Sequence, residues 1–318
     1  MAFLTRNLLI IALLIAACLA FVLPEQAALM NLSWVKEILI FYIFICQGLK
    51  SDFGKLKEIS LFIKPVLIAI ICSQLIAPVL AFTLIQSLNW TGDLAMGVML
   101  MSCMGSTIAS GIIISEQAKA DRELAILLTI ILSLLSVFII PINLSWTLSS
   151  THSTDSQLFI QLLIKLSLYI LLPVLVGQGI KKWLESDRLK KAKSFLKVSP
   201  ILSLATLVFI SIGSNTAMIL TVSSLSVFSL LSLSLTIHYG TMFIALLMCK
   251  GLKISFHKSK AVAILSSQKT LPVAITIWVT QFSEFNLVLS IAIFHLSQIL
   301  GDSLLSKKWA KETQEEVL

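Results

Sequence analysis

The chain has 318 residues, of which 57% are hydrophobic and only 13% are charged, and its formal net charge is +8. Soluble domains carry about 25% charged residues, so this composition excludes a soluble globular protein and indicates an integral membrane protein in a lipid bilayer. The positive charge does not predict nucleic-acid binding, because the basic residues lie in short segments between apolar runs and not on one polar face.

Apolar runs along the chain predict an all-α fold with ten transmembrane helices. The predicted spans are residues 5–24, 34–49, 59–87, 93–115, 123–147, 157–180, 198–219, 224–249, 261–282 and 286–306. About 20 apolar residues are enough to cross the hydrocarbon core. We interpret 5–24 as a retained first helix, because apolar residues continue beyond the IAAC stretch at 15–18, which resembles a cleavage site. Pro78 marks the place where the long third span could tilt or break.

The basic residues divide unevenly between alternate connecting segments. With the N-terminus in the cytoplasm, the cytoplasmic segments hold most of the 24 Lys and Arg residues, and the opposite side holds only Lys36. This asymmetry follows the positive-inside rule. It predicts a multi-pass protein of the inner cell membrane with both termini in the cytoplasm.

The most basic segment, residues 181–197, is predicted to be a cytoplasmic loop between two halves of the chain. Residues 1–180 then hold the first repeat, which is spans one to five, together with the sixth span, which begins the second repeat. Residues 198–306 hold the rest of the second repeat, and residues 307–318 form a charged cytoplasmic tail. Five spans per half would insert the second half upside down relative to the first, and such inverted repeats are typical of secondary transporters.

The fourth and ninth spans occupy corresponding positions in these halves, and both have polar centres. CMGSTIASGIII (103–114) is rich in small residues, and SSQKTLPVAITI (266–277) contains Lys269. Pro272 lacks an amide hydrogen, so the carbonyl of Gln268 loses its helical partner. Because a free carbonyl at membrane depth must line a cavity or bond to protein, we predict a pair of interrupted helices with a binding site between them.

Lys269 is the only charged residue of 261–282, and a charge near the bilayer centre costs at least about 2.5–3.5 kcal/mol on insertion scales. With the positive ends of half-helices beside it, its ammonium makes the predicted site cationic, which suits an anionic ligand. Two alternatives stay open. Lys269 could tie two helices together by bonding to backbone carbonyls, and the small residues of the fourth span could serve only close helix packing.

The predicted substrate- or ion-binding residues come from four spans. They are Ser106, Thr107 and Ser110 in the fourth, Thr129 and Ser133 in the fifth, Ser267, Gln268, Lys269 and Thr270 in the ninth, and His295 and Gln298 in the tenth. For the last pair, a satisfied interhelical hydrogen bond competes with ligand contact, and for the fifth-span pair the competitor is bonding to their own backbone. We interpret His238 as structural, and Lys165 as a residue that extends to the membrane surface.

The five cysteines all lie within apolar segments, with no CxxC pair and no His at ligand spacing. We interpret them as small hydrophobic residues. The sequence therefore predicts no disulfide framework, no metal site and no cofactor.

Three stretches carry a resemblance to a known family: SCMGSTIASGIIISEQAKADRELAILLTIILSLLSVFIIPI (102–142), the SSQKTL element and IFHLSQILGDSLL (293–305). They resemble the bile acid:sodium symporter family, and more closely its SBF-like branch, in which a Lys follows a polar residue in the ninth helix and a His-x-x-Gln follows in the tenth. The resemblance covers essentially the whole chain. It implies a panel domain and a core domain, with helices 4 and 9 unwound where they cross, and alternating access for an organic, usually anionic, solute.

The resemblance also bears on the coupling ion. Sodium-using members carry an acidic residue and a Gln-Asn pair in helix 9, with Ser-Asn in helix 4. Here Gln268 and Thr129 match polar positions of that site. However, Ala109–Ser110 stands in place of Ser-Asn, Lys269 stands in place of the Asn, and residues 261–282 contain no acid. Classical sodium coupling is therefore not expected, because the ammonium could take the electrostatic role of the cation, and the choice between sodium and proton stays open.

The predicted function is secondary transport of a small organic anion, with a second copy of the chain as a candidate partner in a homodimer. An enzyme would show paired carboxylates or His/Asp clusters at a membrane face. Instead, acidic residues are scattered in loops or at span ends, namely Asp121, Glu123, Glu284 and Asp302. One alternative is a sodium- or proton-coupled cation antiporter of related fold, which needs a membrane-buried carboxylate that spans four, five and nine lack. The other is a non-transporting regulatory membrane protein.

Overall fold

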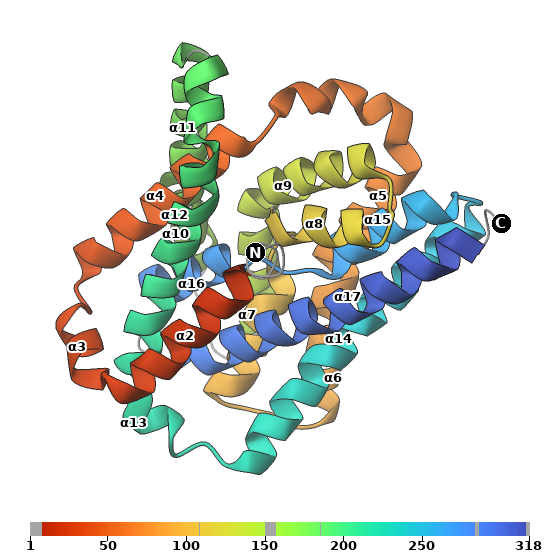
Figure 1. The fold of residues 1–318 in the computed structure, drawn as a ribbon. Helices are drawn as coiled ribbons and strands as arrows, with labels where there is room; N and C mark the ends of the chain where they lie inside the picture. The colour runs from red at the N-terminus through yellow and green to blue at the C-terminus, as the bar shows by residue number, and fades with distance from the viewer. Residues whose placement is uncertain (1–7, 108, 150–156, 185, 284–285, 316–318) are drawn as a thin grey trace. The chain divides into compact units, whose positions relative to one another are not determined.

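The computed structural model describes residues 8–107, 109–149, 157–184, 186–283 and 286–315, and all regular elements within these ranges are helical (Figure 1). The chain divides into two compact units, each built from several separate stretches. The first unit comprises 1–51, 164–224 and 275–289, and the second comprises 52–163, 225–274 and 290–318. Four helices run across a boundary between units: α10 (Gln157–Leu166), α14 (Ser224–Gly251), of which only Ser224 lies in the first unit, α16 (Leu271–Gln281) and α17 (Val288–Glu315).

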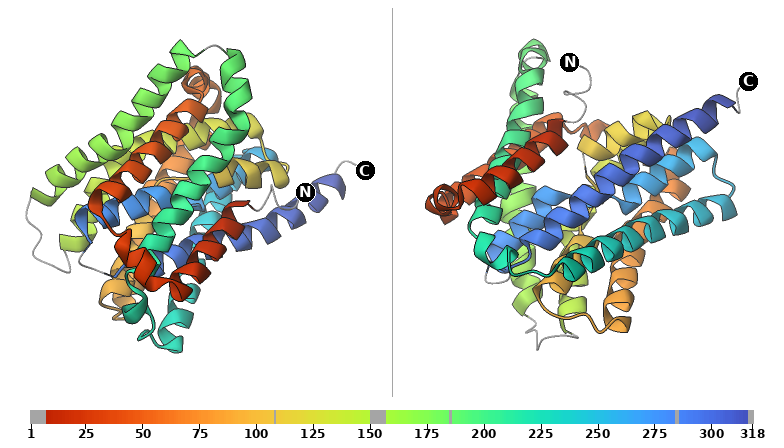
Figure 2. Two further views of the ribbon diagram at one scale, coloured as in Figure 1. Left: turned by 60° about the vertical axis from the view of Figure 1, so that its left-hand side comes forward. Right: turned by 60° about the horizontal axis from the view of Figure 1, so that its bottom comes forward.

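The first unit is a bundle of helices from both halves of the chain. Its elements are α2 (Leu8–Val22), α3 (Pro24–Leu29), α4 (Ser33–Lys50), the π-helical turn η3 (Ser167–Leu171), α11 (Leu172–Trp183), α12 (Ser186–Gly213) and α13 (Thr216–Ile219). Helix α4 lies along α11 and α12 lies along α2 (Figure 2). The backbones of α4 and α11 approach closely at Gly48 and Gly177, where an added Cβ would lie 2.2 Å and 2.3 Å from a backbone carbonyl oxygen of the other helix. Small residues permit this kind of contact between membrane helices.

The second unit holds the remaining elements. They are the 3₁₀-helix η1 (Phe53–Phe62), α5 (Ile63–Ile71), the π-helical turn η2 (Cys72–Ile76), α6 (Ala77–Ser87), α7 (Asp93–Cys103), α8 (Ala109–Gln117), α9 (Arg122–Ser149), α14 (Ser224–Gly251) and α15 (Phe256–Ser267). Most residues of α15 are buried, from Ser259 to Ser267, because α5, α8 and α9 pack around it. This helix is therefore the centre of the unit.

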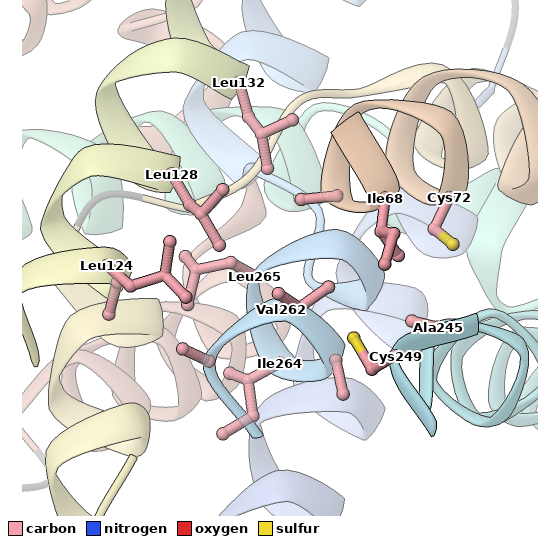
Figure 3. Close-up of a cluster of buried hydrophobic side chains, with 14 of the residues drawn as sticks. Ile68, Cys72, Leu124, Leu128, Leu132, Ala245, Cys249, Val262, Ile264 and Leu265 are labelled. Carbon is pink, nitrogen blue, oxygen red and sulfur yellow. The ribbon is translucent and has the colours of Figure 1, made fainter. Parts of the chain in front are cut away.

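A cluster of apolar side chains surrounds α15 (Figure 3). Leu124, Leu128 and Leu132 recur every four residues on α9 and form one stripe that faces Val262 and Leu265 of α15. In lipid, such contacts stabilise helix association through close packing rather than through removal of apolar surface from water. The cluster holds α15 in place up to its last turn, so it also fixes where the residues that follow Ser267 lie.

Seven helical stretches among the described residues are long and apolar enough to cross a membrane, and the protein is therefore a multi-pass membrane protein. They are Phe53–Ser87, Arg122–Thr147, Phe159–Trp183, Ser194–Gly213, Ser224–Gly251, Phe256–Gln281 and Val288–Lys311. The other three predicted spans match two shorter apolar helices, Leu8–Val22 and Asp93–Cys103, and the helix Ser33–Lys50, which holds three charged residues. The count of ten spans stays a prediction.

Two segments that are predicted to lie in the cytoplasm are largely helical in the structure. Residues 181–197 are predicted as a loop, but α11 continues to Trp183 and α12 begins at Ser186, so most of this segment is helical. The predicted tail at 307–318 is likewise helical as far as Glu315, because α17 continues through it. Basic, polar residues there are good helix formers, which is why charge alone does not mark the end of a helix.

The long third span does not break at Pro78. The π-helical turn η2 precedes the proline, and α6 continues directly from it. Pro78 cannot bond to the carbonyl of Gln74, four residues earlier, and the Asn143 side chain donates to this carbonyl at 2.7 Å instead. A polar residue of α9 thus satisfies the backbone group that the proline leaves free.

Candidate transport site

Both predicted polar segments interrupt a helix in the second unit. Helix α15 ends at Ser267 and α16 begins at Leu271, and residues 268–270 between them are not helical. Residues 104–107, after α7, are not helical either. The two segments are joined by a backbone hydrogen bond in which the Thr270 N–H donates to the carbonyl of Gly105 at 3.0 Å.

The Lys269 ammonium is held inside the second unit by oxygen atoms. The residue is 0% exposed. Its Nζ donates to the carbonyl of Ser73 at 2.6 Å and to the carbonyl of Met104 at 3.1 Å, and the Ser73 hydroxyl oxygen lies at 3.4 Å. These are the backbone contacts of a helix tie, which is the alternative left open for this residue. All three oxygens are neutral, so they satisfy the donors of the ammonium without cancelling its charge.

The side chain of Gln298 on α17 forms hydrogen bonds with both backbone polar groups of Lys269. Its Oε1 accepts from the Lys269 N–H at 2.9 Å, and its Nε2 donates to the Lys269 carbonyl at 2.7 Å. The helix interruption leaves both groups without helical partners, and buried backbone groups need partners. One turn earlier, Nδ1 of His295 lies 3.2 Å from the same carbonyl and 2.9 Å from Nε2 of Gln298. The predicted interhelical hydrogen bonds of these two side chains are therefore present.

Gln268 connects the interruption to α8 and α17. Its Oε1 accepts from the Thr107 hydroxyl at 2.7 Å, and its Nε2 donates to Oδ2 of Asp302 at 2.7 Å. Thr107 in turn accepts from the Ser110 hydroxyl at 2.8 Å and from the Gly111 N–H at 3.0 Å. The structure thus brings three sequence-predicted residues, Thr107, Ser110 and Gln268, into one hydrogen-bond network with Asp302.

The other predicted residues behave in three ways. Ser267 and Thr129 donate to carbonyls of their own helices, at 2.9 Å and 2.8 Å. Thr270 takes part through its backbone N–H. The hydroxyls of Ser106 and Ser133 are buried and have no hydrogen-bond partner among the described residues.

Sequence reasoning missed Asp302 and did not find the partner of His238. Asp302 looks like a span-end acid, but it is 1% exposed, and its Oδ1 lies 2.8 Å from Nε2 of the equally buried His238. The available signal was the spacing on α17, since His295, Gln298 and Asp302 lie three and four residues apart and share one helix face. The partner of His238 is on a different helix, and a single sequence gives no signal for such a contact. Glu284, the other acid near a span end, lies outside the described residues.

Lys165 of α10 has a partner within the protein, because its ammonium donates to the backbone carbonyl of Thr280. Its extension to the membrane surface stays a prediction. Both residues belong to the first unit. A lysine within a span can satisfy its donors with a carbonyl of another helix as well as with headgroups or water.

Several buried polar atoms of the second unit have no hydrogen-bond partner among the described residues: both amide atoms of Gln74, Nε2 of His295 and the hydroxyls of Ser106 and Ser133. Gln74 follows Ser73, and Ser106 follows Met104 by two residues, so both adjoin contacts of the Lys269 ammonium. Buried polar groups are costly unless they are bonded. The Gln74 amide and the Ser106 hydroxyl are therefore candidates for contact with a polar ligand beside the ammonium.

Comparison with known proteins gives one family and several relatives. The model of the SBF-like CPA transporter family matches residues 7–311. The chain is 26% identical over 340 aligned residues to the probable sodium/metabolite cotransporter BASS4, chloroplastic, of Arabidopsis thaliana, and the match covers 99% of this chain and 75% of that protein. It is 25% identical over 289 aligned residues to the uncharacterized sodium-dependent transporter YocS of Bacillus subtilis, with coverage of 89% and 86%.

Proposed function

Since this chain belongs to the SBF-like CPA transporter family, it is a membrane transporter, and we propose that it moves a small organic anion by alternating access without classical sodium coupling. The observation that carries the proposal is the Lys269 ammonium, which is buried among three neutral oxygens at a helix interruption. An uncancelled positive charge in a low-dielectric site attracts an anion more strongly than it does in water.

The architecture of the proposal follows the family. The first unit, which contains the predicted spans one, two, six and seven, is the panel, and the second unit is the core. The interruptions at 104–107 and 268–270 correspond to the unwound centres of helices 4 and 9 in two inverted five-helix repeats. The hydrogen bond between Thr270 and Gly105 supports their crossing. The protein then lies in the inner cell membrane, with both termini in the cytoplasm.

The solute site in this proposal uses the polar atoms that have no partner among the described residues. The Lys269 ammonium supplies the charge, while the Gln74 amide, the Ser106 hydroxyl and Nε2 of His295 supply hydrogen bonds. Neutral donors and acceptors around one fixed charge are a common way to orient an anionic group in a pocket. We do not propose an enzymatic activity, because the family of this chain is a family of transporters.

Sodium is the main competitor as coupling ion, since two relatives are named as sodium transporters. In this chain an ammonium already lies among the carbonyls of Ser73 and Met104, which are ligands of the type that bind hard cations. A sodium ion beside it would be repelled by the like charge. The proposal is therefore transport driven by a proton or by the solute gradient alone.

A cation antiporter of related fold is the second candidate, and the observation in its favour is the buried carboxylate of Asp302. That carboxylate is already bonded to His238 and Gln268. A cation would have to displace these partners, so anion transport stays the first conclusion.

The test is uptake into proteoliposomes of radiolabelled mono-, di- and tricarboxylates and sulfonates, with and without sodium and a pH gradient. Lys269→Met is compared with Lys260→Met, because Lys260 is also buried on α15 and also donates to a backbone carbonyl, that of Ala118 at 2.8 Å. Uptake that ignores sodium, disappears in Lys269→Met and survives in Lys260→Met supports the proposal. Sodium-driven uptake that survives Lys269→Met makes the lysine a helix tie only, and sodium or potassium exchange for protons without anion uptake supports the antiporter.

A further inference from the structure

His238 and Asp302 form a buried pair that the proposed solute site does not use. His238 lies on α14 and Asp302 on α17, and their side chains are 0% and 1% exposed. Nε2 of His238 is 2.8 Å from Oδ1 of Asp302, and Nδ1 of His238 is 3.1 Å from the carbonyl oxygen of Ser267. Both ring nitrogens therefore face oxygen atoms.

The positions of these atoms fix the number of protons on the pair. A backbone carbonyl only accepts, so the bond to Ser267 requires a hydrogen on Nδ1 of His238. The 2.8 Å contact with Asp302 then needs a second hydrogen, carried either by Nε2 or by Oδ1. Without it, a nitrogen lone pair would face a carboxylate oxygen. The pair is neutral with this shared proton and carries one negative charge without it.

Gln268 links this proton to the Lys269 segment. Oδ2 of Asp302 accepts from Gln268, whose other amide atom accepts from Thr107 of the 104–107 segment. Lys269 is the next residue along the chain, and its ammonium is the charge of the proposed solute site. When the pair is neutral, that ammonium is unopposed. When the proton leaves, a buried negative charge faces the same interruption, and in a low dielectric it weakens the attraction for an anion.

The other titratable groups around the pair come from three segments. Tyr239 lies beside His238 on α14, with ring centroids 4.9 Å apart, and its hydroxyl lies against Gly301 of α17. His295 is two turns before Asp302 on α17, and Lys269 lies between α15 and α16. Among the described residues, the other side chain that bonds to Gln268 is the neutral Thr107. Asp302 therefore supplies the one carboxyl group of this network in the part of the chain that the structure describes.

We propose that His238 and Asp302 form a proton-binding site, and that the proton shared between them is the coupling proton of the transporter. Its binding favours the anion beside Lys269, and its release to the aqueous phase on the other side of the membrane favours release of the anion. By linkage, the anion favours protonation of the pair to the same extent. This inference rests on the proposed function for its role in transport, but the proton site itself is independent of any solute.

The test therefore measures the proton site without a solute. Histidine nitrogens are followed by ¹⁵N NMR in protein reconstituted into nanodiscs, from about pH 5 to pH 9, which brackets the range in which free histidine titrates. The chain has four histidines, and His238→Gln identifies the signal of interest. The matched control is His257→Gln, since His257 is exposed and bonds through Nδ1 to the carbonyl of Lys119.

We expect His238 to give the signals of a ring with hydrogens at both nitrogens, or of a hydrogen shared with a carboxylate. In Asp302→Asn, this second hydrogen is lost while His257 is unchanged. A His238 signal that titrates identically in the wild type and in Asp302→Asn overturns the proposal. So does loss of the signal on addition of sodium chloride but not choline chloride, because the pair would then be a sodium site.

Failure of the proposed function gives a different pattern. If the protein transports no anion, the NMR result for His238 and Asp302 can still stand, and only the coupling role is lost. If uptake occurs but the pair binds no proton, the anion transport stands alone. Thermal unfolding of His238→Gln and Asp302→Asn verifies that each variant is folded, and Asp302→Glu, which keeps the carboxylate, should restore the shared-proton signal.

Discussion

The carboxamide of Gln298 pairs with both backbone groups of Lys269, accepting from its N–H at 2.9 Å and donating to its carbonyl at 2.7 Å. A side chain of α17 thereby replaces the helical hydrogen bonds that the interruption after α15 removes. Lys269 is positioned by its neighbours at three points: N–H, carbonyl and ammonium. The interruption is therefore a fixed feature of the second unit, with its polar groups satisfied from outside the helix.

We predict that Gln298→Leu destabilises the protein, because it leaves the N–H and carbonyl of Lys269 buried without this partner. An unsatisfied buried group costs about 1–3 kcal/mol. The control is Ser297→Ala, whose hydroxyl donates only to its own helix, at the carbonyl of Phe294. Thermal unfolding in detergent should show a clear loss of melting temperature for Gln298→Leu alone, and equal melting temperatures would mean that other groups satisfy the Lys269 backbone.

We predict that Thr107→Val reduces transport much more than Thr129→Val. Both changes replace a buried hydroxyl by a methyl of similar size, but Thr107 holds Gln268 in the network, whereas Thr129 bonds only to Ala125 of its own helix. Initial rates of anion uptake should fall at least about tenfold for Thr107→Val, which corresponds to the loss of one buried hydrogen bond of about 1.4 kcal/mol. Similar rates for the two variants would remove Thr107 from the site.

We predict that His295→Leu weakens solute binding without lowering stability. Its Nε2 is buried and has no partner among the described residues, so no protein hydrogen bond is lost at that atom. Its Nδ1 contacts are shared with Gln298, which bonds the Lys269 carbonyl by itself. The half-saturating solute concentration for uptake should rise while the melting temperature stays within error. A large drop in melting temperature with unchanged half-saturation would show that His295 is structural.

We predict opposite outcomes for two glycines of α11. Gly177→Ala should destabilise the first unit, because the new Cβ would lie 2.3 Å from the carbonyl oxygen of Ile45. In Gly179→Ala the new Cβ points into open space. This change should be neutral or should stabilise the protein by up to about 1 kcal/mol, because alanine has the higher helix propensity. The melting temperatures of the two variants are compared with that of the wild type. An unchanged melting temperature for Gly177→Ala would contradict the prediction and would mean that α4 and α11 can move apart at little cost.

The helical, membrane-embedded character of this protein and its membership of a transporter family follow from the amino-acid sequence alone. Long apolar runs must become helices in lipid, because no water is present there to satisfy the backbone. The sequence also located the interruption, because Pro272 removes a helical hydrogen bond and Lys269 has no place on a lipid-facing surface. The small and polar residues around Thr107 marked its neighbour in space.

The contacts of these residues, by contrast, follow from how the helices pack. The partners of Lys269 are backbone carbonyls of Ser73 and Met104, and a carbonyl is present at every residue, so sequence carries no signal for them. The pairing of His238 with Asp302 joins residues 64 positions apart through the packing of α14 against α17. The helical structure within 181–197 also appears only in the fold, since charged residues can end a membrane span without ending a helix. Polar groups that are far apart in the sequence come into contact only through helix packing. In a buried site, these contacts determine which groups are charged.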